Sequence, residues 1–555
     1  MTAVKRITDR VGKIYKFLLR ILEKYYIVFF VAGALVLAFF CFRCLGVKYV
    51  DSWDEARHGV NAYEMIQNGD YIQHTYNYQV DDWNLKPSMS YWGILLGFRL
   101  FGYTVFGLRF TSALAYLLTG IACALFAKRC SKEASILVLG FFCANERPLS
   151  AHLARAGDAD ALYLLFFTLA MLAMLSVKKN HKNVYVCGLM FSLAFLTKSW
   201  HAGMIMAIGG IYLLATGEML RFTKKEWGGF LLSVFAPLIL WFGWRFTKDG
   251  FFFLKQMVEV DLLARTGSAN FEGHQFPFRF YYDMVFGAEG FIYRWQLLIC
   301  VVGLLGELLY LWKRKEWNRT LLEQGGGILL WFLLPFLGFS AIGTKLIWYC
   351  YPCTVPLALG TAAILGWLIR LPLAEVQKAG EQGTSAEAIL AAAEPASQVE
   401  KKNAQGGKTS DIRTLVGISA AVVSVVLVGV YMKNAYFHVI REAHGDLFQI
   451  FIQESVSRDA AYAGEKAYIY VPGEDPETIG TWDQNMLFLA EISGDFHCKD
   501  GGIEEFRKET GQAVLYVDRL DYEENQEQLR GAEVLYENAG YLLLGKQLPN
   551  AVSFD

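Results

Sequence analysis

Residues 25–42 read YYIVFFVAGALVLAFFCF, an apolar run without a single charged side chain. A run of this length can cross the hydrocarbon core of a bilayer as one helix. Seven lysines and arginines precede it, and a basic flank of this kind stays in the cytoplasm. No small-residue cleavage site follows, and the run is too long for the apolar part of a secretory signal peptide. The stretch therefore predicts a signal anchor with a cytoplasmic N-terminus.

The rest of the chain has the same character. Of its 555 residues, 54% are hydrophobic and 19% are charged, which is low for a soluble protein of this size. The net charge of −1 provides no basic field for nucleic acid. We predict a polytopic α-helical membrane protein with about eleven transmembrane helices and an error of about two. The further spans are expected at 104–127, 134–146, 160–177, 184–197, 201–216, 228–246, 291–312, 325–343, 352–370 and 414–432.

Alternation of these spans predicts the topology. It places the basic loops between spans on the cytoplasmic side, as the positive-inside rule requires. The protein is thus expected to be a multi-pass protein of the plasma membrane with its functional loops outside the cytoplasm. The outward-facing regions are then 43–103, 147–159, 247–290, 344–351 and 433–555.

The chain divides into two predicted domains. Residues 1–440 form the membrane domain, and within it 371–413, rich in Ala, Glu, Gln, Lys and Gly, is expected to be a flexible cytoplasmic linker, partly helical. Residues 441–555 form an extracytoplasmic α/β domain. Its strand-like runs are AYIYVPG, AVLYVDRL and YLLLGK, and 484–491 and 504–508 are helical candidates between them.

The acidic pair Asp54-Glu55 opens the first outward-facing region. Ser52 and Glu55 have the spacing of a capping box, and Gly69 supplies a stop, so we predict a short interfacial helix between them. Capping accounts fully for Glu55 and partly for Asp54, through the helix dipole. A rigid helix start is also a suitable place to hold a general base. Asp54 and Glu55 are both catalytic candidates, and Asp54 is the better candidate for the base.

Other charged residues gather in the outward regions. Outward lysines run against the positive-inside bias, so we interpret them as ligands for an anion such as phosphate. Simpler interpretations stay open: snorkelling beside an aromatic belt, mutual pairing of acids and bases, and a loop hydrogen bond for the histidine. The outward-facing residues that are candidates for a functional site are Arg57, Lys86, Arg155, Asp158, Asp160, Lys198, Arg265, His274, Lys345 and Tyr349.

Five short motifs carry a family resemblance. They are DEARHG from Asp54, LKPSMSYWG from Leu85, the Arg155-x-x-x-x-Asp160 pattern, LTKSW around Lys198, and TKLIWYCYP around Lys345. In order and spacing the chain resembles the lipid-dependent glycosyltransferases of the protein O-mannosyltransferase and aminoarabinose transferase superfamily, which have the GT-C fold. The likeness spans about residues 20–370. Where the family usually has Glu-Lys-Pro-Pro, this chain has Leu85-Lys86-Pro87-Ser88. The first position of the motif therefore lacks the acid that could serve as a metal ligand.

The resemblance implies an inverting glycosyltransferase. Its donor would be a sugar on a polyprenyl phosphate, undecaprenyl phosphate if the source is bacterial, and its acceptor would be an extracytoplasmic protein, lipid headgroup or envelope glycan. By family position, Asp54 is the base and Asp160 assists it, with Asp158 a nearby competitor for that second role. The phosphate ligands implied are Lys86, Arg265, Lys345 and Tyr349.

No cofactor is required by the sequence. A divalent metal ion could be held by Asp54, Glu55 and His274, although no ligand spacing demands one. The partners expected are the lipid-linked donor, membrane lipid and the acceptor. The rival hypothesis is a lipid or glycan transporter or flippase, which would place its ionisable residues near the bilayer midplane on broken helices.

Overall fold

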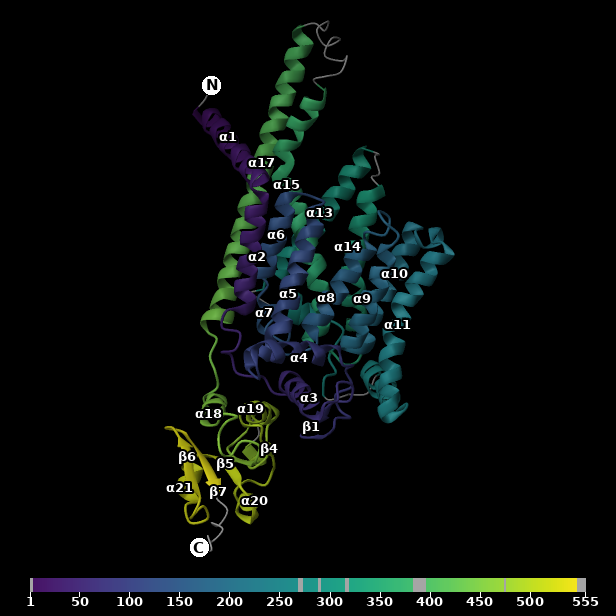
Figure 1. Cartoon of the computed structure of the whole chain (residues 1–555). Coiled ribbons are helices and arrows are strands. Elements are labelled where there is room, and N and C mark those ends of the chain that lie inside the picture. The colour runs from purple at the N-terminus through teal and green to yellow at the C-terminus, as the bar shows by residue number, and fades with distance from the viewer. Residues whose placement is uncertain are drawn as a thin grey trace, which may run out of the picture.

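Every predicted span coincides with a helix in the computed structural model, which describes residues 3–267, 273–287, 291–314, 319–382, 396–473 and 476–546. The helices form a bundle, with a small α/β unit at one end and helix α1 (Ala3–Lys24) diverging at the other (Figure 1). The bundle helices are α2 (Tyr26–Phe42), α5 (Val105–Ala127), α6 (Lys132–Cys143), α8 (Asp160–Met174), α9 (Asn183–Lys198), α10 (Gly203–Thr216), α11 (Lys224–Asp249), α13 (Tyr293–Arg314), α14 (Arg319–Ala341), α15 (Thr354–Gln382) and α17 (Ala396–Ala435).

Fewer of these helices are long enough to cross a membrane than the sequence predicted. Six described stretches pass on length and hydropathy, or seven if α1 and α2, bent by 79°, form one broken span. One of the six joins α9 and α10. Helices α6 and α8 have 12 and 15 residues, short of the roughly 20 that a span needs. Among the described residues, length and hydropathy therefore do not confirm the predicted total of about eleven, because several apolar runs make short helices.

Burial distinguishes the inner helices from the outer ones. Helices α5 and α15 bury most of their apolar side chains, whereas α11 and α17 leave most of theirs at least partly exposed. An apolar, exposed helix face suits contact with lipid. The described ends of the predicted linker are helical, since α15 runs to Gln382 and α17 begins at Ala396. Residues 383–395 lie outside the described part of the chain.

Short elements cover the end of the bundle that faces the α/β unit. They include 3₁₀ and π-helical turns, which are frequent where a helix is interrupted. In chain order they are α3 (Asp54–Asn68), β1 (Thr75–Tyr76), β2 (Gln79–Val80), α4 (Met89–Phe101), α7 (Glu146–Ser150), η1 (Ser199–Ala202), α12 (Phe252–Gln256), η3 (Met257–Ala264), η4 (Tyr282–Phe286), η5 (Ile347–Cys353) and η7 (Tyr436–Arg441).

Helix α3 departs from its prediction in two ways. The capping box is wrong: the helix begins at Asp54, and its N-cap residue, Trp53, makes no side-chain cap. The predicted stop is confirmed, because Gly69 has a left-handed φ of 64°. The helix is also not a surface element. Ten of its residues are buried, since α4 covers one side of it and α19 (Gln484–Gly494) covers another.

The C-terminal unit contains a five-stranded mixed sheet. Strands occur at all three runs identified in the sequence, whereas β4 and β6 were not predicted. The order is β4-β3-β5-β7-β6, with β3 parallel to β4 and β5, and β7 antiparallel to β5 and β6. The strands are β3 (Lys466–Tyr470), β4 (His497–Cys498), β5 (Ala513–Asp518), β6 (Glu533–Glu537) and β7 (Tyr541–Lys546), and the remaining helices are α18 (Leu447–Ser455), α20 (Gly502–Lys508) and α21 (Arg519–Glu524).

Close packing of α4 on α5 requires glycine at one crossing point. A Cβ atom on Gly97 would overlap the carbonyl oxygen of Gly107. Gly97→Ala should therefore destabilise the protein by about 1–3 kcal/mol, the usual cost of overpacking, and lower the melting temperature in a detergent unfolding experiment. Gly210→Ala on α10 is the control, because a Cβ atom at that position would have nothing within 4 Å. Equal melting temperatures for the two variants would contradict this packing.

Candidate active site

Asp54 and Lys86 form an ion pair at the start of α3. The Nζ atom of Lys86 donates to Oδ1 of Asp54 at 3.0 Å, and each side chain is 20% exposed. Burial raises the pKa of Asp54, but the Lys86 ammonium outweighs it, and the pKa lies below its ordinary value. For Lys86, burial lowers the pKa, and the carboxylates of Asp54 and Asp158 outweigh it in the opposite direction. Both partners are therefore charged at neutral pH.

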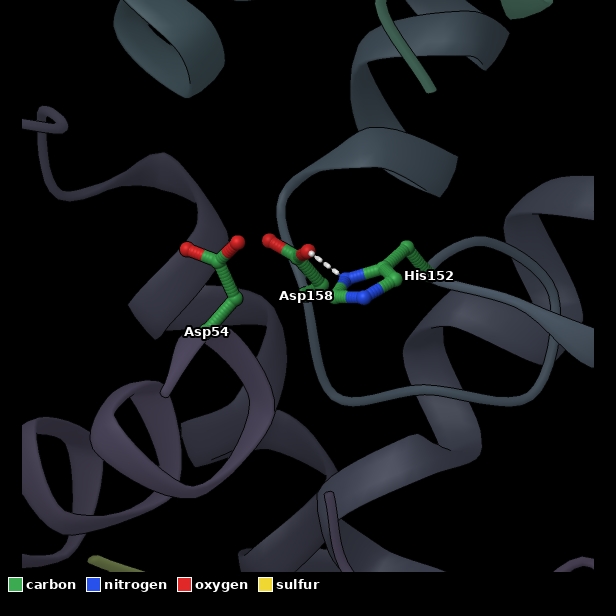
Figure 2. A group of neighbouring side chains, drawn as sticks. All are labelled: Asp54, His152 and Asp158. Atoms are coloured by element: carbon green, nitrogen blue, oxygen red, sulfur yellow. Dashed lines mark hydrogen bonds and ion pairs between the residues drawn. The ribbon is translucent and has the colours of Figure 1, made fainter. Parts of the chain in front are cut away.

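A second carboxylate, Asp158, faces Asp54 across the site (Figure 2). Its Oδ2 atom lies 3.3 Å from Nδ1 of His152, whose ring stacks on Trp348 with 3.8 Å between ring centroids. Burial raises the pKa of Asp158, but the His152 hydrogen bond and the charge of Lys86 keep it below its ordinary value. Burial lowers the pKa of His152, and Asp158 more than compensates, so it lies above its ordinary value.

One candidate metal site is present among the described residues. A ligand atom from each of Asp54, His152 and Asp158 lies within 4.8 Å of the others. Two carboxylates and an imidazole suit a divalent transition metal. The predicted set of Asp54, Glu55 and His274 is not assembled, because Glu55 points to Arg109 and His274 lies in the loop beside Lys345. Lys86 already supplies positive charge at this point.

Asp160 and Lys198 form a second, more deeply buried pair. Asp160 is the first residue of α8, and its Oδ1 atom accepts from Nζ of Lys198 at the end of α9. Oδ2 of Asp160 has no hydrogen-bond partner among the described residues. The Lys198 ammonium lies 5.2 Å from the ring centroid of Tyr349. The charge of Asp160 also acts on Lys86, so the two pairs belong to one site.

A third pair extends the site along η3. Nε of Arg265 lies 3.3 Å from Oδ1 of Asp261, and Asp261 also accepts from the hydroxyl group of Ser199. The charges of Arg265, Asp261, Asp54 and Lys86 all act on Tyr349. The structure therefore brings together seven of the candidate residues: Asp54, Lys86, Asp158, Asp160, Lys198, Arg265 and Tyr349.

Glu55 has a structural partner. Its carboxylate accepts from Nε and Nη2 of Arg109 at 2.6 and 2.8 Å, and both side chains are 1% exposed. The backbone N–H groups of Gly157 and Asp51 also donate to it, at 2.7 and 3.1 Å. With these partners Glu55 is not available as a base, which corrects its place among the catalytic candidates.

Three other predicted anion ligands have different partners. Arg155 donates to the carbonyl groups of Phe40, Cys41 and Cys44 at 3.0, 3.2 and 3.0 Å, and so caps the C-terminal end of α2. Lys345 donates to the carbonyl groups of Phe276, Ile342 and Gly343. Arg57 makes two hydrogen bonds to Asp81, both of 2.8 Å, and lies against the rings of Tyr76 and Trp83.

Two residues next to Asp54 and Asp158 were not identified from the sequence. His152 opens the stretch that contains Asp158, and it could have been weighed as a partner for that acid. His58 follows Asp54 by one helical turn, and its Nδ1 atom donates to the Asp54 carbonyl oxygen at 2.6 Å. Burial and the nearby Lys86 charge lower the pKa of His58 to about 4. His58 is therefore neutral at pH 7.

The sequence has relatives of known class. Residues 85–241 match the family model described as dolichyl-phosphate-mannose-protein mannosyltransferase. An undecaprenyl phosphate-alpha-4-amino-4-deoxy-L-arabinose arabinosyl transferase of Pseudomonas fluorescens is 27% identical over 343 residues, which are 57% of this chain and 56% of the relative. An uncharacterised Aquifex aeolicus protein is 30% identical over 336 residues, 59% of this chain and 68% of that protein. The chain thus matches a little over half the length of the Pseudomonas enzyme.

Solved structures have the same fold. ArnT from Cupriavidus metallidurans, crystallised in the apo state and bound to undecaprenyl phosphate, aligns with TM-scores of 0.58 and 0.59 at 18% identity. Each alignment covers 94% of this chain and 98% of ArnT. With the family model and the sequence relatives, this agreement shows that the chain belongs to the superfamily of GT-C fold glycosyltransferases that includes the protein mannosyltransferases and the aminoarabinose transferases.

Proposed function

We propose that this protein is an inverting glycosyltransferase that moves a sugar from a polyprenyl phosphate, undecaprenyl phosphate in a bacterium, to a hydroxyl group on an extracytoplasmic acceptor. The observation that carries the proposal is the Asp54–Lys86 ion pair. It places a candidate base and a candidate phosphate ligand together, with 3.0 Å between Oδ1 and Nζ, on the fold of this superfamily. The named activity of the Pseudomonas relative and the lipid in the ArnT complex support the donor class.

The pair can serve both halves of a single displacement. Asp54 is ionised, so it can take the proton of the acceptor hydroxyl as the oxygen attacks the anomeric carbon. The bond to the phosphate oxygen then breaks, and the leaving phosphate gains negative charge. Lys86 can stabilise that charge. Binding of the donor phosphate to Lys86 would also release Asp54 from its ion pair, so the base becomes free when the donor is present.

The second and third pairs extend this arrangement. Lys198 and Arg265 can bind further oxygens of the phosphate group, since cations suit phosphate oxygens. Asp160, whose Oδ2 atom has no described partner, can accept a hydrogen bond from a hydroxyl group of the sugar or acceptor. Asp158 with His152 lines the same space. We assign Asp160 the assisting role because its oxygen is available, whereas Asp158 is held by His152.

A transporter is the less favoured alternative. The ionisable groups of the site lie in loops, at helix ends and on short elements at one end of the bundle, rather than along broken helices at its middle. The named relatives are transferases. We also propose that the N-terminus is cytoplasmic, and that the site and the C-terminal α/β domain lie outside the cytoplasm. The sugar and the acceptor are to be identified by comparing envelope glycans with and without this protein.

Loss of the base is the most direct test. Asp54→Asn should lower the transfer rate from undecaprenyl-phosphate sugars by about 100-fold or more, because an amide cannot take the hydroxyl proton. Transfer is followed as release of undecaprenyl phosphate by protein in nanodiscs supplied with envelope acceptors. Asp283→Asn is the matched control, since Asp283 is exposed, pairs with the exposed Arg279 and lies outside the segment that leads into Asp54. Full activity of Asp54→Asn would exclude this residue as the base.

Binding of the lipid carrier tests Lys86. Lys86→Met should weaken binding of undecaprenyl phosphate to the purified protein by about 10-fold or more, because a charge-assisted contact to the phosphate is lost. Microscale thermophoresis with undecaprenyl phosphate provides the affinity. Lys508→Met, which removes an exposed ammonium paired with Glu504 and Glu505 on α20, should bind as the unchanged protein does. Equal affinities for both variants would rule out Lys86 as a phosphate ligand.

The same pair predicts a change in pH dependence. Asp54 works as a base when ionised, and its depressed pKa keeps it ionised at pH values where an ordinary Asp begins to protonate. In Lys86→Met, burial is no longer opposed by the ammonium, so the pKa of Asp54 should rise. The acid limb of residual kcat/KM should then move to higher pH, while the Lys508→Met control keeps the original profile. An unshifted limb in Lys86→Met would refute the electrostatic coupling.

A further inference from the structure

The segment that leads into Asp54 needs outside support. Trp53, directly before Asp54, has φ of 63° and ψ of −113°. A residue with a Cβ atom is disfavoured at such angles and keeps them only where surrounding contacts hold it. No side-chain cap fixes this helix start. The direction of the Asp54 side chain therefore depends on whatever holds residues 48–53.

The membrane bundle holds this segment from one side. Arg109 of α5 donates to the carbonyl groups of Lys48 and Tyr49 at 2.9 and 2.7 Å, and it binds Glu55. These contacts fix the residues before Val50 and the residue after Asp54. They leave the backbone of Val50 to another partner.

The C-terminal unit holds the segment from the other side. Oε1 of Gln449, on α18, accepts from the Val50 N–H group at 2.8 Å, and its Nε2 atom donates to the Val50 carbonyl group at 3.0 Å. Gln449 is 4% exposed and Val50 is 1% exposed. Asn485 of α19 adds a longer contact of 3.4 Å to the same carbonyl group. One buried side chain thus satisfies both polar groups of the Val50 backbone.

Packing against the C-terminal unit also holds α3 further along its length. Gly59 lies directly against the Phe488 ring of α19, where a Cβ atom would come within 2.6 Å of it. Ala56 and Val60 share one hydrophobic core with Phe488. Figure 1 shows α3 at the end of the bundle, next to α4 and beside α19 of the C-terminal unit. The helix that begins with Asp54 is therefore enclosed by two parts of the chain.

We propose that the C-terminal unit positions the active site, and that Gln449 is the positioning residue that holds the start of α3 so that Asp54 meets Lys86. The inference rests on the proposed role of Asp54 as the base. A domain that served only as a tether would need surface contacts alone. Here a buried amide binds the backbone just before the base, while Lys86 is carried by the membrane domain. The Asp54 half of the ion pair is thus held by both parts of the molecule, and the Lys86 half by the membrane domain.

The test compares three variants of the full chain in nanodiscs. Gln449→Leu keeps an uncharged side chain and removes both hydrogen bonds. Gln449→Glu keeps an acceptor for the Val50 N–H group but, when ionised, cannot donate to the Val50 carbonyl group. Gln453→Leu is the matched control, because Gln453 lies one turn along α18 and is exposed. Hydrogen–deuterium exchange of residues 48–58 reports how firmly this segment is held. Turnover of the donor reports the effect on catalysis.

We expect the amides of residues 50–57 to exchange at least about 10-fold faster in Gln449→Leu than in the control. Turnover should fall by about 10-fold with KM for the donor unchanged, because Lys86 is not displaced. The acid limb of the pH profile should move upward as Asp54 loses its close contact with Lys86. Gln449→Glu should show a smaller loss, and less of it at low pH, where the protonated carboxyl group can donate.

The outcomes separate the two proposals. Unchanged exchange in Gln449→Leu would overturn the inference, and so would faster exchange with unchanged turnover and pH profile. An equal loss of turnover in the Gln453→Leu control would also overturn it, since the effect would then belong to α18 as a whole. Activity of Asp54→Asn would remove the proposed base, while faster exchange in Gln449→Leu would still establish the grip on residues 48–58.

Discussion

The buried ion pair between Glu55 and Arg109 is the interaction on which the site depends. Arg109 joins α5 to the segment before α3, and Glu55 ties the first turn of α3 to Arg109 and to the backbone of Gly157. Leaving either charge without its partner in so buried a place would cost about 3–5 kcal/mol. The pair fixes the first turn of α3 and the loop that carries Asp158, so it sets the distance between the two facing carboxylates.

This arrangement gives two adjacent acids different roles. Glu55 is enclosed by donors, whereas Asp54 has Lys86 as its ion-pair partner and stays partly exposed. Arg155 makes a similar structural contribution, since it caps α2 and keeps the loop of Asp158 against the bundle. Charged residues of one motif thus serve either structure or the proposed chemistry, according to whether their partners are buried backbone groups or an accessible ion pair.

The remaining charges of the site are paired with one another. Two ion pairs, Lys86 with Asp54 and Lys198 with Asp160, carry these charges. Each pair joins residues from different helices or loops. An anionic donor that binds the cations would release the acids, so donor binding and activation of the base would be coupled. On the proposed function, this coupling would limit proton transfer to the state in which the leaving group is already bound.

The sequence by itself determined the helices and pointed to candidate site residues. Long apolar runs in a membrane satisfy their backbone groups as helices, so each predicted span is a helix, and the motifs singled out Asp54, Lys86, Asp160 and Lys198, which the structure places in two ion pairs. Only the tertiary structure decided which charges meet. Helix α3 has Trp53 rather than Ser52 as its N-cap, and Glu55 binds Arg109, which is distant in the chain; likewise His152 joins Asp158, and Gln449 reaches Val50 from the C-terminal unit. Hydropathy is a local property of the chain, whereas ion pairs and backbone contacts depend on which distant segments the packing brings within hydrogen-bond distance.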